Sequence, residues 1–283
     1  MLLGTARILS ESRSSLKGTV KLIFQPSEEA GTGAPAMIKD GVLETPPLDG
    51  IIGLHTGNLW KGFRSGQIGY RFGALMAGAD WFKITFEGKG GHGATPHLAV
   101  DPIAMACQAV SAIQMIVSRE VSPLASAVVT VGQITGGTAP NIIAPACVIG
   151  GTLRSLDPET RALLKERIKA ICEDVAHAMR GHAVVEFTYG PPPLINNKVM
   201  TEKVKQVAVD LLGKDAVLEV PEPTMGGEDM AFFMEKVPGT FFFHPSGFGE
   251  GKDNPHHHPG FDINEDVLWV GSAVMSHFAL TWQ

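Results

Sequence analysis

The sequence predicts an α/β protein in which a mainly parallel sheet domain is interrupted by an inserted α+β domain. In the outer parts of the chain, apolar runs typical of buried strands alternate with helical patterns, as in βαβ units. In the middle, strands of alternating polarity are combined with two long amphipathic helices, which indicates an antiparallel sheet covered on one face. We therefore expect residues 1–76 and 191–283 to form the sheet domain and residues 77–190 the inserted domain.

The first part of the sheet domain is expected to hold two helices and two buried strands. Residues 2–11 have a helical pattern, and a shorter helix that starts at residue 33 is stopped by Gly41. Continuous apolar runs at residues 18–24 and 49–55 predict the two buried strands.

The inserted domain is expected to follow the order strand, helix, strand, strand, helix, strand. Its first helix runs to Glu120 and is capped by Asp101, with Pro102 at the first helical position. Its second helix starts at residues 157–158 and has an apolar face with helical spacing, made of Leu164, Ile168, Ile171, Val175 and Met179. The four strands are expected at residues 80–90, 126–134, 147–156 and 183–190.

The proline-rich segment 190–197 is the expected linker back to the sheet domain. After it the alternation of helices and strands resumes. The pattern predicts a helix at residues 199–212, a turn at 226–233, a strand at 239–244 and a last helix from Glu265 towards Thr281.

Composition limits the classes of function. The 283 residues are 44% hydrophobic and 18% charged, which is typical of a globular protein with a large core. The net charge of −6 argues against nucleic acid or an anionic membrane as the main partner, because both bind basic surfaces. The three scattered cysteines show no C-x-x-C pair, and neither a signal peptide nor a membrane-spanning run is found. We expect a cytoplasmic protein with reduced thiols.

Polar side chains gather at the ends of the predicted strands of the sheet domain. Glu28 and Glu29 follow the first strand, His55 ends the second, and three histidines, 256–258, precede the last helix. Ligands of open α/β sheets bind beyond the carboxyl ends of the strands, so these groups are candidates for one site. Carboxylate and imidazole suit zinc, and a second carboxylate can take a proton from water. The alternatives are a solvated acidic loop and structural histidines.

The inserted domain carries three further candidates. His92 lies among glycines in "GKGGHGATPH", where the backbone and the imidazole can come close to a ligand. Asn141 can donate a hydrogen bond to an oxyanion, and the fork of Arg154 suits a carboxylate. A tight hairpin, a turn amide and a surface ion pair are the alternatives.

Seven motifs along the whole chain resemble, in the same order, those of a known enzyme family. The family is that of zinc-dependent peptidases and amidohydrolases, which includes hippurate hydrolases, N-acyl-amino-acid amidohydrolases (aminoacylases) and plant auxin-conjugate hydrolases. The motifs are "FQPSEEAG", "GLH", "GKGGHGATPH" followed by "AVDPI", "GGTAPNII", "GTLRSLD", "GGEDMAFF" and "HHHPGFDINE". The resemblance implies a catalytic α/β domain with an inserted lid domain that forms a homodimer.

The resemblance also implies roles for the residues of the sheet domain. Glu28 matches the family's general base, and Glu29 and His55 match metal ligands. His257 matches a third ligand, because the family's ligand stands two positions before the proline, here Pro259. The implied cofactor is a divalent metal, zinc or alternatively manganese or cobalt.

For the inserted domain, the resemblance implies that His92 steadies the oxyanion of the transition state. Asn141 and Arg154 match substrate-binding groups. The implied substrate is an N-acyl amino acid or a small peptide, whose amide bond is hydrolysed.

The chain also departs from the family pattern. A segment with a Cys-Gly-His-Asp-x-His motif, which supplies two more metal ligands, comes before the position of Met1 in the family. We therefore expect a truncated sheet domain and an incomplete metal site. A catalytically impaired binding or dimerising remnant and an esterase-like hydrolase with an altered site are the alternative functions. His244 stands where the family has a small residue, as a substitute ligand or as a space-filling wedge.

Overall fold

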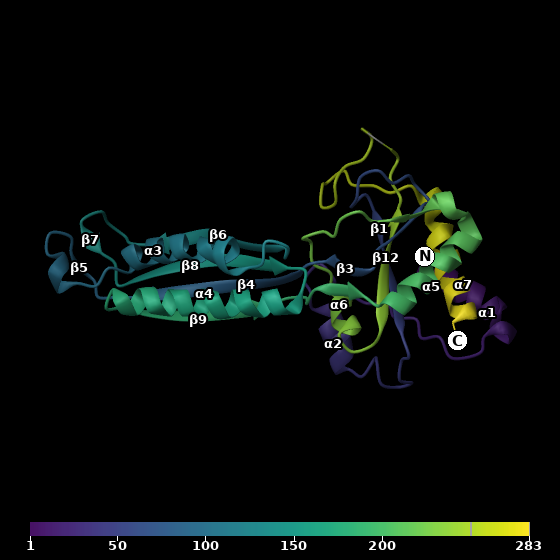
Figure 1. Ribbon diagram of the computed structural model, residues 1–283, viewed down its shortest axis with the longest axis horizontal. Helices are drawn as coiled ribbons and strands as arrows, with labels where there is room; N and C mark the ends of the chain where they lie inside the picture. Colours follow the sequence, from purple (N-terminus) through teal and green to yellow (C-terminus); the bar gives the residue numbers. More distant parts are fainter. Residues whose placement is uncertain (250, 283) are drawn as a thin grey trace. The chain divides into compact units, whose positions relative to one another are not determined.

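The computed structural model describes residues 1–249 and 251–282 and contains two compact units, whose elements are labelled in Figure 1. Unit 1 comprises Met1–Leu75, Leu194–Pro223 and the chain from Asp229 onward. Unit 2 comprises Met76–Pro193 and Thr224–Glu228. Among the described residues, no helix combines the length and the apolar character needed to cross a membrane.

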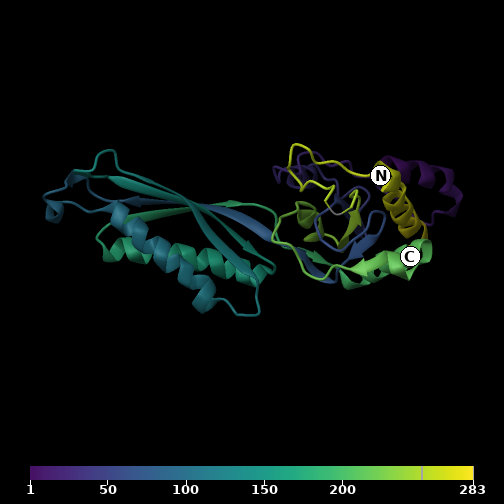
Figure 2. The ribbon, with the colours of Figure 1, turned by 90° about the horizontal axis from the view of Figure 1, so that it is seen from above.

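Unit 2 is a four-stranded antiparallel sheet with two helices on one face (Figure 2). The strand order is β6 (Ala127–Gly136), β8 (Ala146–Ser155), β4 (Gly78–Glu87) and β9 (His182–Tyr189). The two helices are α3 (Pro102–Met115) and α4 (Pro158–Ala178). A separate pair of short strands is formed by β5 (Gly91–His92) and β7 (Ile142–Ile143). The predicted order of helices and strands in this region is confirmed.

Local sequence explains the helices of unit 2. Asp101 accepts hydrogen bonds from the backbone N–H groups of Ile103 and Ala104, and Asp157 accepts one from Thr160, so both predicted caps form. Beyond Met115 the first helix continues as one π-helical turn over Ile116–Glu120. The core between helices and sheet is built from buried apolar side chains, among them Phe82, Ile84, Phe86, Ile113, Ile149, Leu153, Leu164 and Ile168.

Unit 1 contains a four-stranded mixed sheet. Its strand order is β1 (Ile51–Gly57), β12 (Gly239–Pro245), β2 (Ile68–Tyr70) and β11 (Val217–Glu219). The outer pairings, β1 with β12 and β11 with β2, are parallel, and the pairing of β12 with β2 is antiparallel. A second, two-stranded sheet pairs β3 (Gly73–Met76) with β10 (Leu194–Asn196).

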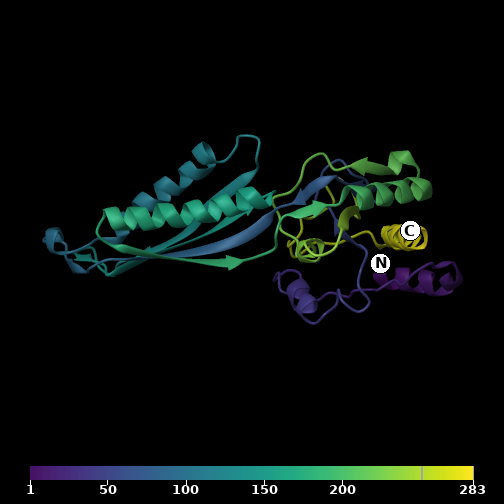
Figure 3. The ribbon, with the colours of Figure 1, turned by 60° about the horizontal axis from the view of Figure 1, so that its bottom comes forward.

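The helices of unit 1 pack in two groups. In the first, α7 (Leu268–Thr281) contacts both α1 (Leu2–Glu11) and α5 (Lys198–Leu212) (Figure 3). In the second, α2 (Gly33–Lys39) contacts α6 (Met230–Met234). A 3₁₀ turn over Glu265–Val267 precedes α7, so the last predicted helix starts slightly later than expected.

The predicted buried strand at residues 18–24 is wrong. This segment has no strand assignment, and its side chains are not buried: Val20 is 37% and Phe24 55% exposed. A strand requires a neighbouring strand to take its backbone hydrogen bonds, and apolar character alone does not supply one. The segment is held instead by the ammonium group of Lys21, which donates to the carbonyls of Val42, Thr45 and Pro46.

Candidate metal centre

Glu28 and Glu29 lie in a tight loop, residues 25–32, between the extended segment 18–24 and α2. The hydroxyl groups of Ser27 and Thr32 are 2.8 Å apart and join the two sides of the loop. Ser27 has a φ of 58°, in the left-handed region that non-glycine residues rarely adopt. These two features give the loop that carries Glu28 and Glu29 a defined backbone conformation.

A glycine closes the base of this loop. A Cβ atom on Gly33 would lie 1.7 Å from the carbonyl oxygen of Pro26, a distance at which only a hydrogen fits. This close approach brings the two ends of the loop together and starts α2 directly behind the carboxylates.

His55 lies on β1, and its ring is mostly buried. Its Nδ1 atom is 2.9 Å from the carbonyl oxygen of Thr56. A carbonyl only accepts, so Nδ1 carries the proton and the lone pair of Nε2 remains available to a ligand. Burial and the neighbouring His256 lower the pKa of His55 to about 4, so the ring is neutral near pH 7. A neutral imidazole with a free Nε2 is the form that binds a metal.

His257 and Glu29 face each other across the two loops that carry them. Nε2 of His257 is 3.9 Å from Oε2 of Glu29, and both side chains are largely exposed. His257 has a φ of 65°, a second non-glycine residue of the site in the left-handed region. The structure therefore brings this predicted histidine ligand next to the predicted carboxylate ligand.

His256 is one of the three candidate histidines, and it has a different role from the expected ligand His257. Its Nε2 accepts a hydrogen bond of 3.2 Å from the backbone N–H of Asn58, just beyond β1. Its ring lies between those of His55, with centroids 5.0 Å apart, and Phe261, with centroids 4.5 Å apart. His256 therefore supports the imidazole of His55 while its own Nε2 is occupied.

Glu28 lies in a more enclosed, more acidic environment than Glu29. Burial raises the pKa of Glu28, and the nearby carboxylates of Asp229 and Glu29 raise it further. Asp229 itself is 1% exposed. Asp229 lies in the motif "GGEDMAFF", whose sequence alone does not indicate a role for this residue.

The structure decides between the two alternatives for His244. The ring is fully buried, its Nδ1 is 3.2 Å from the hydroxyl of Thr56, and its Nε2 is 3.1 Å from the carbonyl of Val267. Nε2 therefore donates to that carbonyl, and Nδ1 accepts from the hydroxyl. Because both ring nitrogens have protein partners, His244 is a structural wedge.

The three candidates of the inserted domain lie in unit 2. His92 on β5 and Asn141 beside β7 are exposed neighbours, since the N–H of Gly93 donates to the carbonyl of Asn141. Arg154 lies on β8 in the larger sheet, with its guanidinium 5.8 Å from the centre of the Trp81 ring. His92 and Asn141 are thus brought together, and Arg154 belongs to a different sheet.

The predicted ligands of unit 1 are of the types that suit a divalent cation, although Glu29, His55 and His257 do not form a group of described residues whose ligand atoms all lie within 4.8 Å of one another. Glu29 and His257 supply a carboxylate and an imidazole that already face each other, and His55 adds an imidazole with a free Nε2. Three such ligands with one open position are typical of catalytic zinc sites.

Two curated relatives illustrate what the chain is similar to. The N-acetyl-L-cysteine deacetylase of Bacillus subtilis is 44% identical over 269 residues, which cover 94% of this chain and 61% of the relative. The IAA-amino acid hydrolase ILR1-like 5 of Arabidopsis thaliana is 41% identical over 286 residues, which cover 99% of this chain and 64% of the relative. The chain thus spans less than two thirds of the length of these relatives.

Two solved structures are also similar to this chain along nearly its whole length. A putative aminohydrolase from methicillin-resistant Staphylococcus aureus matches 98% of this chain and 70% of its own, with a TM-score of 0.91 and 32% identity. A dinuclear metal-binding peptidase of the M20 family from Bacillus subtilis matches 99% of this chain and 69% of its own, with a TM-score of 0.81 and 30% identity. The model of Peptidase family M20/M25/M40 matches residues 1–281, and the chain belongs to this family.

Proposed function

We propose that this protein is a metal-dependent hydrolase that cleaves the amide bond of N-acyl amino acids or small peptides. Glu29, His55 and His257 hold a divalent ion, zinc or alternatively manganese or cobalt, and Glu28 is the general base. The observation that carries the proposal is the pairing of Glu29 with His257 in unit 1, together with the free Nε2 of His55 and the second, more enclosed carboxylate of Glu28.

The relatives support this substrate class. Their names describe a deacetylase of N-acetylcysteine and a hydrolase of amino acid conjugates, and one similar structure is described as a dinuclear metal-binding peptidase. In all these substrates an acyl group is joined to an amino acid through an amide. Amide hydrolysis is therefore the activity to test first.

The residues of the site divide the chemical work. When bound, the metal would polarise the amide carbonyl and lower the pKa of water. Glu28 takes a proton from the attacking water and returns it to the leaving amine. Its raised pKa suits this role, because a base works best when its pKa lies close to the operating pH. His55, whose lowered pKa keeps its ring neutral near pH 7, would hold the ion together with His257 and Glu29.

The candidates of unit 2 would act on the substrate. An exposed imidazole such as that of His92 can donate a hydrogen bond to the oxyanion that forms at the amide carbon. Arg154 and Asn141 carry donors that match a substrate carboxylate. We propose these three roles together with a lid function for unit 2.

The decisive experiment combines turnover with metal analysis. We expect Glu28→Ala to abolish release of free amino acid from N-acetyl-L-cysteine and related N-acyl amino acids while it leaves the metal content unchanged. Glu29→Ala should lose both turnover and metal. Glu11→Ala, on the exposed face of α1, is the matched control and should behave as the wild type. Retained turnover in Glu28→Ala would contradict the assignment.

The same measurements separate the alternatives. Less than one metal ion per chain after incubation with zinc, manganese or cobalt would favour the catalytically impaired remnant. Turnover that survives chelators but stops with serine-directed reagents would favour the esterase-like hydrolase.

We also propose a cytoplasmic homodimer formed through unit 2. β6 is at the edge of its sheet, and its Val128 and Ile134 are 40% and 51% exposed. Such an edge can pair with a second copy. The variant Ile134→Lys places a charge on this edge and should shift the protein to a monomer, which light scattering would measure.

The cytoplasmic location is supported by the cysteines. All three are free, in agreement with a reducing compartment.

A further inference from the structure

Asp229 is a buried carboxylate whose hydrogen-bond partners lie outside its own helix. It immediately precedes α6, at the position where an aspartate normally caps the helix, yet its side chain makes no capping hydrogen bond there. With 1% exposure it cannot rely on water for hydrogen bonds. Its acceptors are used by another part of the chain.

Both carboxylate oxygens of Asp229 bind the loop that carries Glu28 and Glu29. Oδ1 accepts a hydrogen bond from the side-chain amide of Gln25, and Oδ2 accepts one of 3.1 Å from the backbone N–H of Ala34. Gln25 lies at the start of the loop, and Ala34 lies in the first turn of α2, directly after the loop. One side chain, about two hundred residues away in sequence, therefore bridges the entry and the exit of the loop.

The bond to Ala34 also completes α2. This helix starts at Gly33, and its N-cap residue Thr32 makes no side-chain capping bond. The carboxylate of Asp229, which comes from a distant part of the chain, caps α2 in place of Thr32. It also supplies the negative charge that a helix N-terminus favours. This contact ties the first turn of α2, directly after the loop, to Asp229.

We propose that Asp229 is a positioning residue that fixes the metal-ligand and base carboxylates, Glu29 and Glu28, by anchoring both ends of their loop. The catalytic consequence rests on the function proposed above. Two hydrogen-bonding atoms in fixed directions are needed, since one must accept from a backbone N–H and the other must bind a side-chain amide. Displacement of reacting groups by about 1 Å can cost about a hundredfold in rate.

The test compares two substitutions of the same residue. Asp229→Ala removes both anchors. We expect faster hydrogen exchange at the Ala34 amide, at least tenfold weaker zinc binding in competition with a chromophoric chelator, and a kcat lowered ten- to a hundredfold with little change in KM. Asp229→Asn keeps both anchors, because its oxygen can accept from Ala34 while the amide of Gln25 turns over to accept from the new amide group. It should retain slow exchange and zinc binding.

Two further variants protect the test. Gln25→Ala removes one anchor and should give an intermediate effect, which is informative even when Asp229→Ala is too unstable to purify. Asp40→Asn, at the exposed other end of α2, is the matched control and should change nothing. Wild-type exchange and zinc binding in Asp229→Ala, or an equal loss in Asp229→Asn, would overturn the proposal. Exchange and zinc binding remain readable if no N-acyl amino acid is turned over, so failure of the proposed function is distinguishable.

Discussion

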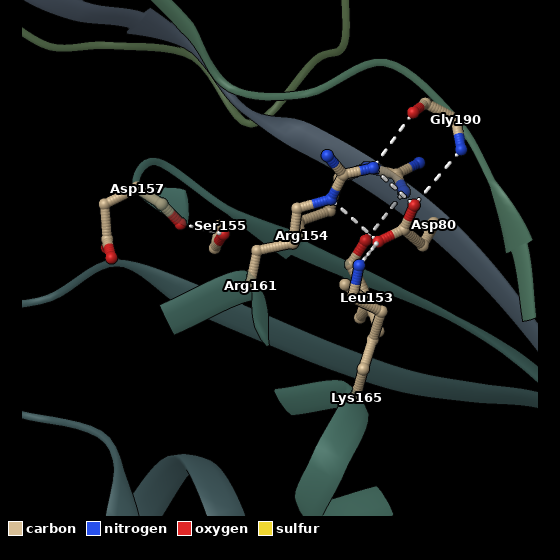
Figure 4. Close-up of polar contacts among 8 residues, drawn as sticks. All are labelled: Asp80, Leu153, Arg154, Ser155, Asp157, Arg161, Lys165 and Gly190. Atoms are coloured by element: carbon tan, nitrogen blue, oxygen red, sulfur yellow. Dashed lines mark hydrogen bonds and ion pairs between the residues drawn. The ribbon is translucent and has the colours of Figure 1, made fainter. Parts of the chain in front are cut away.

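The two units each contain a fully buried aspartate, and the two carboxylates are satisfied in opposite ways. In unit 2, Asp80 is 0% exposed and accepts hydrogen bonds of 2.8 and 2.6 Å from Arg161, with Lys165 at 3.5 Å (Figure 4). The backbone N–H of Gly190 adds a bond of 3.1 Å, and the carbonyl of Gly190 accepts from Arg161. In unit 1, Asp229 is bound by two neutral amides.

The difference separates a structural carboxylate from one beside a candidate active site. The charge of Asp80 is neutralised by its cations, and its partners join β4, α4 and the end of β9 into one structure. No cation is among the hydrogen-bond partners described for Asp229. Its negative charge therefore contributes to the raised pKa of Glu28. Neutral donors hold a carboxylate in place while they leave its field to act on a neighbour.

The largest expected effect is on the stability of unit 2. Asp80→Ala leaves Arg161 as a nearly buried cation without its partner, which typically costs about 3–5 kcal/mol. Native-state hydrogen exchange of the β4 and β9 amides would measure this loss. Glu186→Ala, which removes an exposed ion pair with Lys83 on the same sheet, is the control and should cost less than about 1 kcal/mol. Equal losses in the two variants would contradict the comparison.

Removal of charge alone should sharpen the contrast. Asp80→Asn cannot balance Arg161 and Lys165, so we expect a loss of roughly 2 kcal/mol or more in the free energy of unfolding. Asp229→Asn should cost less than about 1 kcal/mol, because its neutral partners can still be bound. Urea unfolding of both variants against the wild type measures the difference. A larger loss of unfolding free energy for Asp229→Asn than for Asp80→Asn would contradict the view that only Asp80 depends on its charge.

His244 extends the comparison to a buried base with neutral partners. Burial lowers the pKa of His244 in the folded protein below the value of 6.5 that it has in the unfolded chain. At a pH between these two pKa values, the unfolded chain binds a proton that the folded protein does not. Stability should therefore fall as the pH decreases below 6.5. His244→Gln removes this proton, and the slope of unfolding free energy against pH should decrease by at most about 1.4 kcal/mol per pH unit. An unchanged slope between pH 7.5 and 5.5 would show that the ring is not buried as a neutral group.

The smallest effect is expected at the rim of the Asp80 cluster. Lys165 is 3.5 Å from Asp80 and its side chain is 21% exposed, so Arg161 can satisfy the carboxylate without it. Lys165→Met should cost about 0–1 kcal/mol in thermal unfolding. Arg161→Met, with a similar change in shape, should cost several times more. Similar losses of stability in the two variants would show that Lys165 and Arg161 contribute equally, and would contradict this prediction.

Much of the fold could be predicted from local pattern. Caps such as Asp101 and Asp157 announce helices because each side chain bonds backbone groups two or three residues away. Alternating polarity located the strands of unit 2 in the same way. The strand prediction at residues 18–24 failed because apolar residues state a preference for burial, whereas a strand depends on a partner from elsewhere in the chain.

The site was predictable to the extent that its motifs are contiguous. Glu28 with Glu29, His55 and His257 were singled out from short motifs, and their roles stay predictions. Asp229 and His256 were not given roles, since their importance appears only through contacts with Gln25, Ala34 and Asn58.

By itself the sequence determined the helices, most of the strands and the kinds of chemical group that the protein carries. These properties depend on residues a few positions apart, whose interactions are built into the geometry of helix and strand. Only the tertiary structure decided which buried aspartate is neutralised by cations and which anchors a loop through neutral amides. That distinction depends on partners 81 residues away for Asp80 with Arg161 and 195 residues away for Asp229 with Ala34, which packing of the whole chain brings together.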